Sequence, residues 1–527
     1  MTTRYRLFSF VLLIAAFALV MPLGAQEDET ILSFEAEAPY NALSGSSEIA
    51  DCWACSEGLI VSNANIDTQW SLQFNRVDVP NEGWYTLAID YLNGGSGSPI
   101  SVHTAALEVN YSAPTITIPF PSYGDWNIPT SLVVDVPIYL RAGSNTLRFF
   151  NSGGLGAAYF DRITLTPAPE RPSQGECGDG DPRDPNVQPF SCDSIWNMPI
   201  GADAVYVPAD IQWEDSTVAE PFEHPTFIVA DINWFFVAGT SDPVRGSFDP
   251  GEPNEEEPNG LWRCNGGSIY NGVLHFPDNA FVGDATLDPY ETPNNAGAML
   301  QPDGRTLVQF QPLARCEATG DVYGYAAATQ DLYGQGILGG HFGSGLSSIG
   351  GMLRAGELTG DEPIRHALQI ELGGGWNYYY STDRFGYRWP ADRHDWGAAE
   401  SYGGSNPALL AGSLLALPPD VTAEALGIQT EPGLKLFHAL QDYGAYVVDD
   451  AVLNVFQFGV EGAVLDDFEQ TYGFSFETPD NVDWENPPAW LTDVWAIFDA
   501  LHIIDNNSSN SIGGGGAPRQ PYAPPLR

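Results

Sequence analysis

The run Gly83-Trp-Tyr-Thr-Leu-Ala-Ile-Asp-Tyr91 shows what kind of fold opens this chain. Tyr, Leu, Ile and Tyr occupy every second position in it, and this period of two is typical of a strand that buries one face. Related runs stand at Trp70-Ser-Leu-Gln-Phe74 and Asn145-Thr-Leu-Arg-Phe-Phe150, and turn-forming clusters such as Asn93-Gly-Gly-Ser-Gly-Ser98 separate them. Short strands at regular spacing indicate a β-sandwich over residues 31–167.

The composition extends this expectation to the whole chain. Of the 527 residues, 12% are aromatic and 43% hydrophobic, while 56 are glycine and 41 are proline. Aromatic and β-branched residues favour strands, and glycine and proline favour the turns between them. We therefore predict a mainly β protein, in which an N-terminal β-sandwich is followed by a larger β-rich, sandwich-like module with a few helices.

The charge of the chain excludes two classes of partner. It has 68 acidic residues against 20 Lys and Arg, a formal net charge of -48, and Lys435 is its single lysine. Nucleic acids and anionic membranes bind proteins through clustered cations, and the sequence contains no basic run. We expect no nucleic acid and no membrane as partner, and we infer no protein partner.

The first 25 residues have the features of a secretory signal peptide. Arg4 and Arg6 precede an apolar stretch from Leu7 to Val20, and Pro22-Leu-Gly-Ala25 offers a small-residue cleavage site. No later segment supplies about 20 consecutive apolar residues, the length that a membrane-spanning helix needs. The sequence therefore predicts a protein secreted to the extracellular space.

Six cysteines fall into three pairs that are local in the sequence. An even number of cysteines in an exported chain favours disulfides. The expected pairs are Cys52 with Cys55, Cys177 with Cys192, and Cys264 with Cys316. A zinc site at the first pair would need a second Cys or His pair nearby, and the sequence has none there.

The rest of the chain divides into a linker, a second module and a tail. Residues 168–190 are rich in Pro, Gly and Asp and resemble a linker, and residues 519–527 form a Pro-rich tail. Between them, residues 191–518 form the larger module. Within it, apolar residues at helical spacing predict helices over 433–448 and 490–504.

Five motifs of the first block, taken in order, resemble carbohydrate-binding module family 35. They are Phe34-Glu-Ala-Glu37, Cys52-Trp-Ala-Cys-Ser-Glu-Gly58, Gly83-Trp-Tyr-Thr-Leu-Ala-Ile-Asp-Tyr91, Leu140-Arg-Ala-Gly-Ser-Asn-Thr-Leu-Arg-Phe149 and Asp161-Arg-Ile-Thr-Leu165. The resemblance implies a jelly-roll β-sandwich that binds sugars through loops at one end. It also implies a structural calcium ion near the first and last strands.

Residue by residue, the resemblance places calcium ligands at Glu35, Glu37 and Asp161, and sugar contacts at Trp126 and Asn151. Glu35 and Glu37 share one face of a strand, which allows both to reach one ion, although a solvent-exposed face has the same pattern. A sugar ring needs an exposed aromatic platform and an amide. Trp126 could instead cap the sandwich core, and Asn151 could be a turn residue.

The larger module resembles a group of exported bacterial and fungal proteins, and this resemblance implies a shared fold unit and secretion only. It rests on the glycine-rich run Gly339–Leu358, on Tyr387-Arg-Trp-Pro-Ala391 and on the run from Leu440 to Asp450. Gly343-Ser-Gly-Leu-Ser is not a nucleophile elbow, because its second glycine comes too early. A serine triad is therefore not expected.

Carboxylates and histidines in glycine-rich or strand contexts remain as catalytic candidates, together with a cation and a tyrosine. These candidates are Glu357, His366, Glu371, Asp449, His341, Arg354 and Tyr443. Gln369 and Glu371 share one strand face, which suits a groove for hydroxyl groups or an ordinary solvent face. We expect at most one of Asp449 and Asp450 to face a given site, because neighbouring strand residues point to opposite faces.

Several of these candidates have an equally simple structural role. Glu357 beside Arg354 could form an ordinary salt bridge. His366 could be a buried, hydrogen-bonded histidine or a general acid or base tuned by burial. Tyr443 falls within a helical pattern and could belong to the core.

Binding modules of this kind are usually joined to an enzyme that acts on the same polymer. We therefore predict a secreted glycoside hydrolase that binds and cleaves a polysaccharide, with Glu357 paired with Asp449 or Glu371. One alternative is a polysaccharide lyase acting on uronates, which needs a cation and a proton acceptor. Another is a glycan-binding or structural protein without turnover. We expect structural calcium in the first module and no cofactor for catalysis.

Overall fold

The structure of the chain is a computed structural model. It describes residues 31–527 apart from residues 64–69, 94–102, 111, 121–128, 135–137, 152–157, 168–176, 213–226, 249, 251–262, 264–269, 281, 283–293, 316, 318, 328, 382–385, 396, 452–454, 480 and 484. The expected signal peptide, Trp126, Cys264 and Cys316 lie outside the described residues. Their roles therefore stay predictions.

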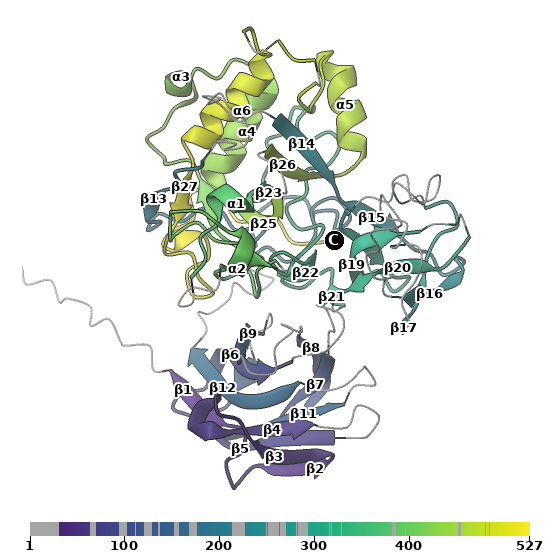
Figure 1. The fold of residues 1–527 in the computed structure, drawn as a ribbon, viewed down its shortest axis with the longest axis vertical. Helices are drawn as coiled ribbons and strands as arrows, with labels where there is room; N and C mark the ends of the chain where they lie inside the picture. Colours follow the sequence, from purple (N-terminus) through teal and green to yellow (C-terminus); the bar gives the residue numbers. More distant parts are fainter. Residues whose placement is uncertain are drawn as a thin grey trace, which may run out of the picture.

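The first module is a β-sandwich of two antiparallel sheets (Figure 1). The strands of one sheet are β10 (Ile138–Leu140), β6 (Gly83–Leu92), β12 (Tyr159–Pro167), β4 (Leu59–Asn63) and β3 (Ser47–Asp51), with β1 (Leu32–Glu35) beside β12 and β9 (Thr130–Val133) beside β6. The strands of the other sheet are β2 (Ala42–Gly45), β5 (Trp70–Val79), β11 (Gly143–Asn151), β7 (His103–Val109) and β8 (Ser112–Phe120).

The core of the sandwich follows the alternation read along β6. Leu87 and Ile89 are fully buried in one apolar cluster with Leu72 and Phe149 of the other sheet, whereas Ala88 between them is only half-buried and not in the core. Two sheets that bury alternate side chains between them are held mainly by this apolar contact. The predicted sandwich and the mainly β character of the chain are confirmed.

The larger module contains two further sheets, which we call the central sheet and the side sheet. The central sheet consists of β13 (Tyr206–Pro208), β27 (His502–Ile504), β24 (Leu414–Ala416), β25 (Ala445–Ala451), β23 (Leu368–Gly373), β26 (Val455–Val460) and β14 (Phe227–Ile232). The side sheet consists of β15 (Trp234–Val237), β18 (Gly297–Leu300), β19 (Thr306–Ala314), β20 (Val322–Ala326), β16 (Val244–Phe248) and β17 (Tyr270–His275), with β21 (Gln330–Asp331) beside β19. The short strand β22 (Leu338–His341) begins the glycine-rich run.

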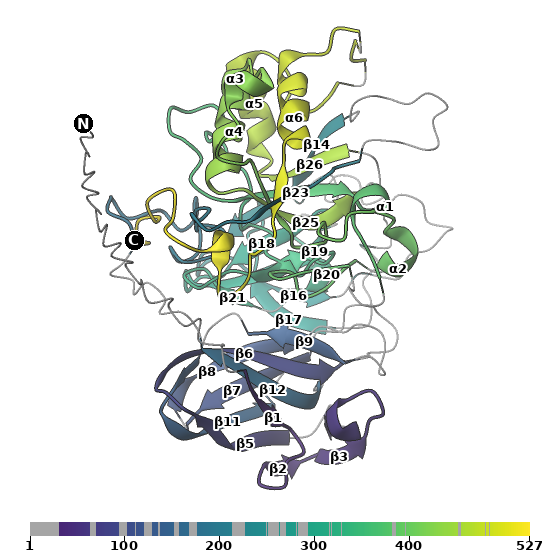
Figure 2. The same ribbon diagram turned by 90° about the vertical axis from the view of Figure 1, so that its left-hand side faces the viewer.

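The longer helices cover one face of the central sheet, at the end of the molecule away from the sandwich (Figures 1 and 2). The longer helices are α4 (Glu431–Asp442), α5 (Ala463–Tyr472) and α6 (Ala489–Asp499), and the short ones are α1 (Gly374–Asn377), α2 (Ala398–Ser401) and α3 (Ala423–Leu426). Phe498 of α6 stacks on Phe456 of β26 with ring centroids 3.9 Å apart. The opposite face of the central sheet is left for the glycine-rich run and the side sheet.

The two predicted helices end earlier than their apolar patterns. The helix expected over 433–448 ends at Asp442, because Gly444 has a φ of 78° and the chain then enters β25. The helix expected over 490–504 ends at Asp499, before β27. A short, fully buried strand has a continuous apolar run, and spacing alone does not separate such a run from a helix.

The described part of the expected linker is paired with the C-terminal tail. Cys177 forms a disulfide with Cys192, and Arg183 donates its backbone N–H to Pro525 O at 2.8 Å. The buried Arg183 side chain also donates to Pro524 O at 2.6 Å. Residues 177–190 therefore belong to the larger module, and the tail packs along them.

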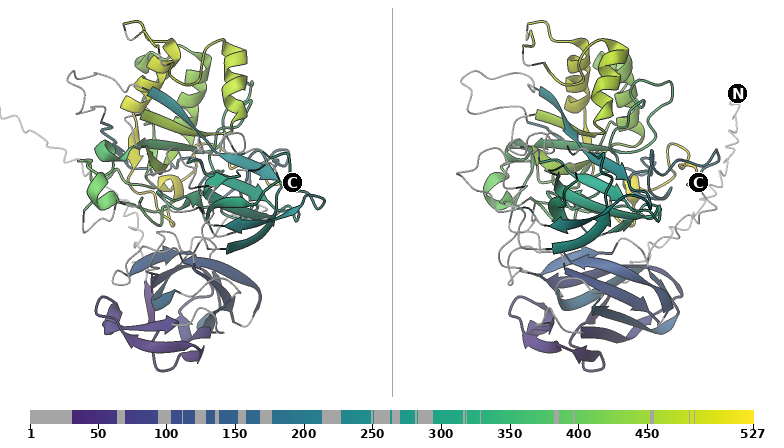
Figure 3. Two further views of the ribbon diagram at one scale, coloured as in Figure 1. Left: turned by 45° about the vertical axis from the view of Figure 1, so that its right-hand side comes forward. Right: turned by 90° about the vertical axis from the view of Figure 1, so that its right-hand side faces the viewer.

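The sandwich lies against the larger module in all views (Figures 1 to 3). A cavity of about 230 Å³ between them is lined by Thr86 and Ser131 from the sandwich and by Trp389 and Ser509 from the larger module.

The expected disulfide between Cys52 and Cys55 is also formed. None of the described helices is long and apolar enough to cross a membrane.

Candidate active site in the larger module

A cavity of about 560 Å³ lies between the central sheet and the side sheet. Its described lining is Val229, Ala230, Asp231, Asn294, Asn295, Gln311, Pro312, Tyr325, Phe342, Gly343, Glu371, Asp395, Asp449, Asp450, Val455 and Gln457. Five of these residues carry carboxyl groups, and no arginine or lysine is among them. Ligand-binding cavities of this size are common at the junctions between layers of a fold.

Strands of the central sheet supply most of the carboxyl groups. Asp231 is near the end of β14, Glu371 is in β23, and Asp449 and Asp450 are in β25, while Asp395 comes from a loop. The strand β26 lies between β14 and β23, and β23 also pairs with β25, so segments far apart in the sequence meet in neighbouring strands. The sheet thus brings together carboxyl groups that are more than 200 positions apart in the sequence, as Asp231 and Asp450 are.

A β-bulge changes how β25 presents its two aspartates. Ile370 pairs with Val447 and Glu371 pairs with Asp449, so Val448 is an extra residue in the parallel pair. Bulges bend a strand and change the direction of the side chains that follow. Asp449 and Asp450 both line the cavity, and the expectation that at most one of them would face it was wrong.

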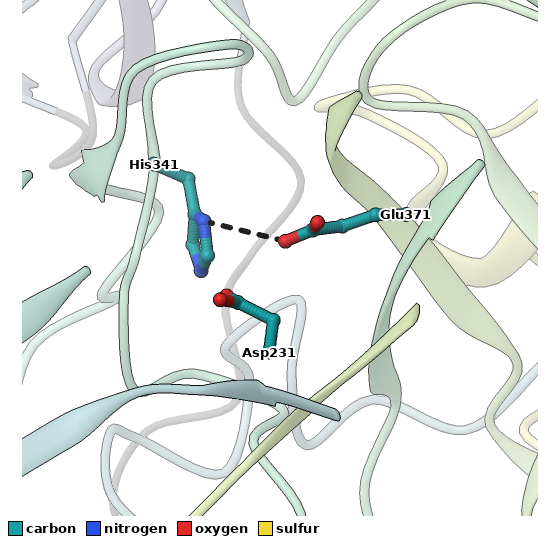
Figure 4. Close-up of side chains that lie close together, drawn as sticks. All are labelled: Asp231, His341 and Glu371. Atoms are coloured by element: carbon teal, nitrogen blue, oxygen red, sulfur yellow. Dashed lines mark ion pairs between the residues drawn. The ribbon is translucent and has the colours of Figure 1, made fainter. Parts of the chain in front are cut away.

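His341 lies beside these carboxyl groups and is fully buried. Its Nδ1 atom is 4.0 Å from Glu371 Oε1 and 3.7 Å from Asp449 Oδ2, which is beyond hydrogen-bond length. Neither ring nitrogen of His341 has a hydrogen-bond partner. Figure 4 shows the imidazole and the carboxyl groups of Glu371 and Asp231 converging from three segments.

Amide side chains orient two of the aspartates. Asn295 donates from Nδ2 to Asp231 Oδ1 at 3.0 Å, and Gln311 donates from Nε2 to Asp449 Oδ2 at 3.0 Å. Gln311 is held in turn by the backbone N–H of Phe342, which donates to Gln311 Oε1 at 2.6 Å. These hydrogen bonds fix the direction of the carboxyl groups of Asp231 and Asp449.

The electrostatics of the cavity favour protonated acids. Burial, followed by the charges of Asp231 and Asp449, raises the pKa of Glu371 well above its usual range. Burial and the charges of Asp449 and Asp395 raise the pKa of Asp450 to about 8. Carboxyl groups that share a site without a nearby cation can therefore hold protons near neutral pH.

The remaining catalytic candidates lie elsewhere. His366 Nε2 is 2.9 Å from Glu357 Oε1, and the backbone N–H of Arg354 donates to Glu357 Oε2 at 2.7 Å. The buried Arg354 guanidinium stacks 5.1 Å from the ring centre of Phe235. None of Glu357, His366 and Arg354 lines the described cavity, and their contacts are those of a buried ion pair.

Tyr443 is also outside the cavity, in the apolar core beside the end of α4. The structure therefore brings together three of the seven candidates, His341, Glu371 and Asp449. Sequence reasoning did not single out Asp231 or Asp395. Nothing in their local sequence distinguishes them from other acidic residues of this very acidic chain.

A second group of acidic side chains lies in the sandwich. Ser56 Oγ is 2.5 Å from both Glu35 Oε2 and Asp161 Oδ1. Glu37 is 8% exposed, and neither of its carboxyl oxygens has a hydrogen-bond partner. Burial, together with the charges of Glu35 and Asp161, raises the pKa of Glu37. The three predicted calcium ligands are thus near one another.

The predicted sugar contacts are not described, but another aromatic residue is exposed. Trp126 and the side chain of Asn151 lie outside the described part of the chain. Trp53 is 83% exposed, within the loop that the disulfide between Cys52 and Cys55 closes. A short disulfide loop fixes the backbone under this ring, so the indole is an available flat apolar surface.

Comparisons with known proteins concern the first module. No protein-family model matches the chain, and no curated protein matches it. The N-terminal region is similar to a family 35 carbohydrate-binding module from Clostridium thermocellum, with 30% identity over 26% of this chain and 99% of that one, at a TM-score of 0.23. A family 35 module from Paenibacillus barcinonensis is 19% identical over 26% of this chain and 99% of that one, also at 0.23.

An exo-β-1,3-galactanase from Phanerochaete chrysosporium is 26% identical over 26% of this chain, at a TM-score of 0.22. This chain covers 29% of the length of that enzyme. The resemblance to carbohydrate-binding modules therefore covers about a quarter of the chain. What is said of the larger module rests on its own geometry.

Proposed function

We propose that this protein is a secreted carbohydrate-active enzyme whose sandwich binds a polysaccharide and whose larger module hydrolyses glycosidic bonds. The observation that supports hydrolysis is the convergence of five carboxyl groups in one cavity of about 560 Å³. Hydrolysis of a glycosidic bond requires two carboxyl groups, one that donates a proton to the leaving oxygen and one that is ionised.

Asp450 and Asp449 are the pair to which we assign these roles. The pKa of Asp450 is raised to about 8 by burial and by its acidic neighbours, so it carries a proton at neutral pH. Asp449 accepts hydrogen bonds from Gln311 Nε2 and from the backbone N–H of Asp450, each at 3.0 Å. Asp450 is thus the proton donor, and Asp449 is the nucleophile, because an oxygen of each lies within 4.8 Å of the other and leaves too little room for the water that an inverting base activates.

The rest of the lining suits a neutral sugar. Tyr325 and Phe342 contribute aromatic surface, with ring centres 6.3 Å apart and planes at 83°. Aromatic rings pack against the C–H faces of sugars, and the amides of Gln311 and Asn295 can bind hydroxyl groups. A uronate would bring its negative charge beside five carboxyl groups without a lysine or arginine in the described lining. We therefore favour hydrolysis over the elimination that a lyase performs.

In the sandwich, we propose a sugar-binding surface that includes Trp53 and a structural calcium ion at Glu35, Glu37 and Asp161. The unpartnered carboxyl oxygens of Glu37 support the calcium assignment, because a buried carboxylate without donors requires a cation or a proton. Oxygen donors alone suit calcium better than a softer metal. Calcium here would join the first and last strands of the sandwich through Glu35 and Asp161.

The test is incubation of the mature protein with neutral and uronate-containing polysaccharides. Reducing ends, ultraviolet absorbance and polymer pull-down are measured for the wild type, Asp449→Asn, Asp450→Asn and the exposed control Asp420→Asn. New reducing ends that both cavity variants lose and the control keeps are expected. An unsaturated, ultraviolet-absorbing product would show that the reaction is elimination and not hydrolysis. Pull-down without turnover on every polymer would favour a binding protein.

A further inference from the structure

We propose that His341, Asp231 and Glu371 bind one divalent metal ion of the zinc or manganese class at the wall of the cavity. This inference goes beyond the proposed function and does not depend on it, because metal binding can be measured without any substrate. It also departs from the expectation of no cofactor in this module. The three residues come from β22, β14 and β23.

The spacing of the three side chains fits a shared ion. One potential ligand atom of each lies within 4.8 Å of the others. His341 Nδ1 and Glu371 Oε1 are 4.0 Å apart, too far for a direct hydrogen bond. Two ligands that are each about 2.0 to 2.2 Å from one ion lie roughly 3 to 4.4 Å apart, depending on the angle between them.

His341 is the observation that distinguishes this group from a mere acidic cluster. Its side chain is fully buried, and both ring nitrogens lack a hydrogen-bond partner. Buried histidines normally use their nitrogens, because an unpaired buried polar atom loses its hydration without replacement. Figure 4 shows this imidazole beside the carboxyl groups of Asp231 and Glu371, with a dashed line from one ring nitrogen to Glu371.

The three ligands are held in place before any ion binds. Glu371 is in a strand paired on both sides, with β25 and with β26. Asp231 accepts a hydrogen bond from Asn295 Nδ2 at 3.0 Å. The carbonyl of His341 accepts the backbone N–H of Gly345 at 2.6 Å, which closes the glycine-rich turn. Metal sites depend on such supporting contacts to orient their ligands.

Charge and donor type point to the class of the ion. The described lining holds five carboxyl groups and no lysine or arginine, so a divalent cation would offset part of the repulsion. One imidazole with two carboxylates is a mixed nitrogen and oxygen set, which suits zinc or manganese better than calcium or magnesium.

The experiment uses the mature protein after chelator treatment, in buffer with excess calcium to fill the sandwich site. Zinc chloride and manganese chloride are titrated separately by isothermal calorimetry into the wild type, Asp231→Asn, Glu371→Gln, Asp450→Asn and Asp420→Asn. We expect one equivalent of zinc or manganese, a loss of affinity of at least about tenfold in the first two variants, and a smaller change in the last two.

Asp450→Asn separates this inference from the proposed function, because that variant should lose turnover while it keeps the metal. X-ray absorption at the metal edge of the loaded wild type requires no variant to fold, and it should show nitrogen among the ligands. The inference is overturned by the absence of stoichiometric binding, by an all-oxygen shell, or by equal affinity in the wild type, Asp231→Asn and Glu371→Gln.

Discussion

A side chain at position 343 would collide with Asp449. The Cβ atom of any residue there would lie 1.9 Å from Asp449 Oδ1 and 3.3 Å from the Asp449 Cα. Glycine at this position is therefore required for the loop after β22 to pack against the bulged end of β25. The close approach explains one of the glycines that make the run from Gly339 so conspicuous in the sequence.

The substitution Gly343→Ala should displace Asp449 and strongly lower turnover. Because the backbone as well as the carboxylate is close, we also expect a loss of roughly 1 to 3 kcal/mol in the free energy of unfolding. Urea denaturation and initial rates measure the two effects. Gly83→Ala is the control, since a Cβ at Gly83 meets no atom within 4 Å. Wild-type rates in Gly343→Ala would contradict the role of Asp449.

The rate of glycan cleavage should fall as the pH rises through about 8. The pKa of Asp450 is raised to about 8, so its proton is present below that pH and lost above it. Asp450→Asn should reduce kcat by about 100-fold or more, which is the usual effect of losing a general acid. The pH dependence of kcat/KM tests this assignment. A rate that stays constant up to pH 9.5 would exclude Asp450 as the proton donor.

Glu357 and His366 should stabilise the fold without taking part in catalysis. Burial opposes both charges, but the pairing outweighs it, lowering the pKa of Glu357 and raising that of His366. The His366 contribution is present below its unfolded pKa of about 6.5 and is lost as the pH rises through its folded pKa. The Glu357 contribution is present above its unfolded pKa of about 4.3 and is lost as the pH falls through its folded pKa.

Glu357→Gln should therefore cost about 3 kcal/mol of unfolding free energy near pH 6 and less at high pH. Denaturation by urea at several pH values measures this, with Asp420→Asn as a surface control. Catalysis per folded molecule should stay within about twofold of the wild type. If Glu357→Gln abolished turnover and left stability unchanged, Glu357 would be a catalytic carboxylate.

Trp53→Ala should weaken polysaccharide binding by about tenfold. The reason is that packing a sugar on an aromatic ring contributes a free energy of about one to a few kcal/mol. Stability should not change, because the ring is 83% exposed. Affinity electrophoresis in polymer-containing gels measures the effect. Trp84→Ala, at a ring that is 45% exposed on β6, is the matched control. Equal mobility of both variants and the wild type would remove Trp53 from the sugar-binding surface.

Calcium should raise the thermal midpoint of the wild type and have little effect on Glu37→Gln. The reason is that Glu37 is buried and its carboxyl oxygens are unpartnered, so an ion stabilises the native state only when the carboxylate is present. Without calcium, Glu37→Gln should be as stable as the wild type or more so. Differential scanning calorimetry with calcium and with chelator makes the comparison. An equal calcium response in both proteins would place the ion elsewhere.

The sequence predicted those features that depend on local patterns. The alternation along β6 predicted which side chains enter the sandwich core, and Leu87 and Ile89 are there. Glu371 was a candidate because it shares a polar strand face with Gln369, and Asp449 because it follows an apolar, strand-like run. The helix expected over 433–448 failed at Gly444, because a buried strand directly after a helix continues its apolar pattern.

The remainder of the site depends on pairing that no local pattern contains. Asp231 reaches Glu371 because β14 and β23 lie on either side of β26 in one sheet. Glu357 and His366 were candidates in the sequence just as His341 was, yet they bind each other. The order of strands across a sheet, which decides these neighbours, is a property of the whole chain.

The extra residue at Val448 makes the direction of the acidic side chains depend on one position that the pairing of the sheet does not need. Loss of one codon there would restore ordinary pairing between β23 and β25 and turn the following side chains to new directions, while most of the sheet kept its contacts. One residue in β25 thus separates the requirements of the sheet from those of the cavity.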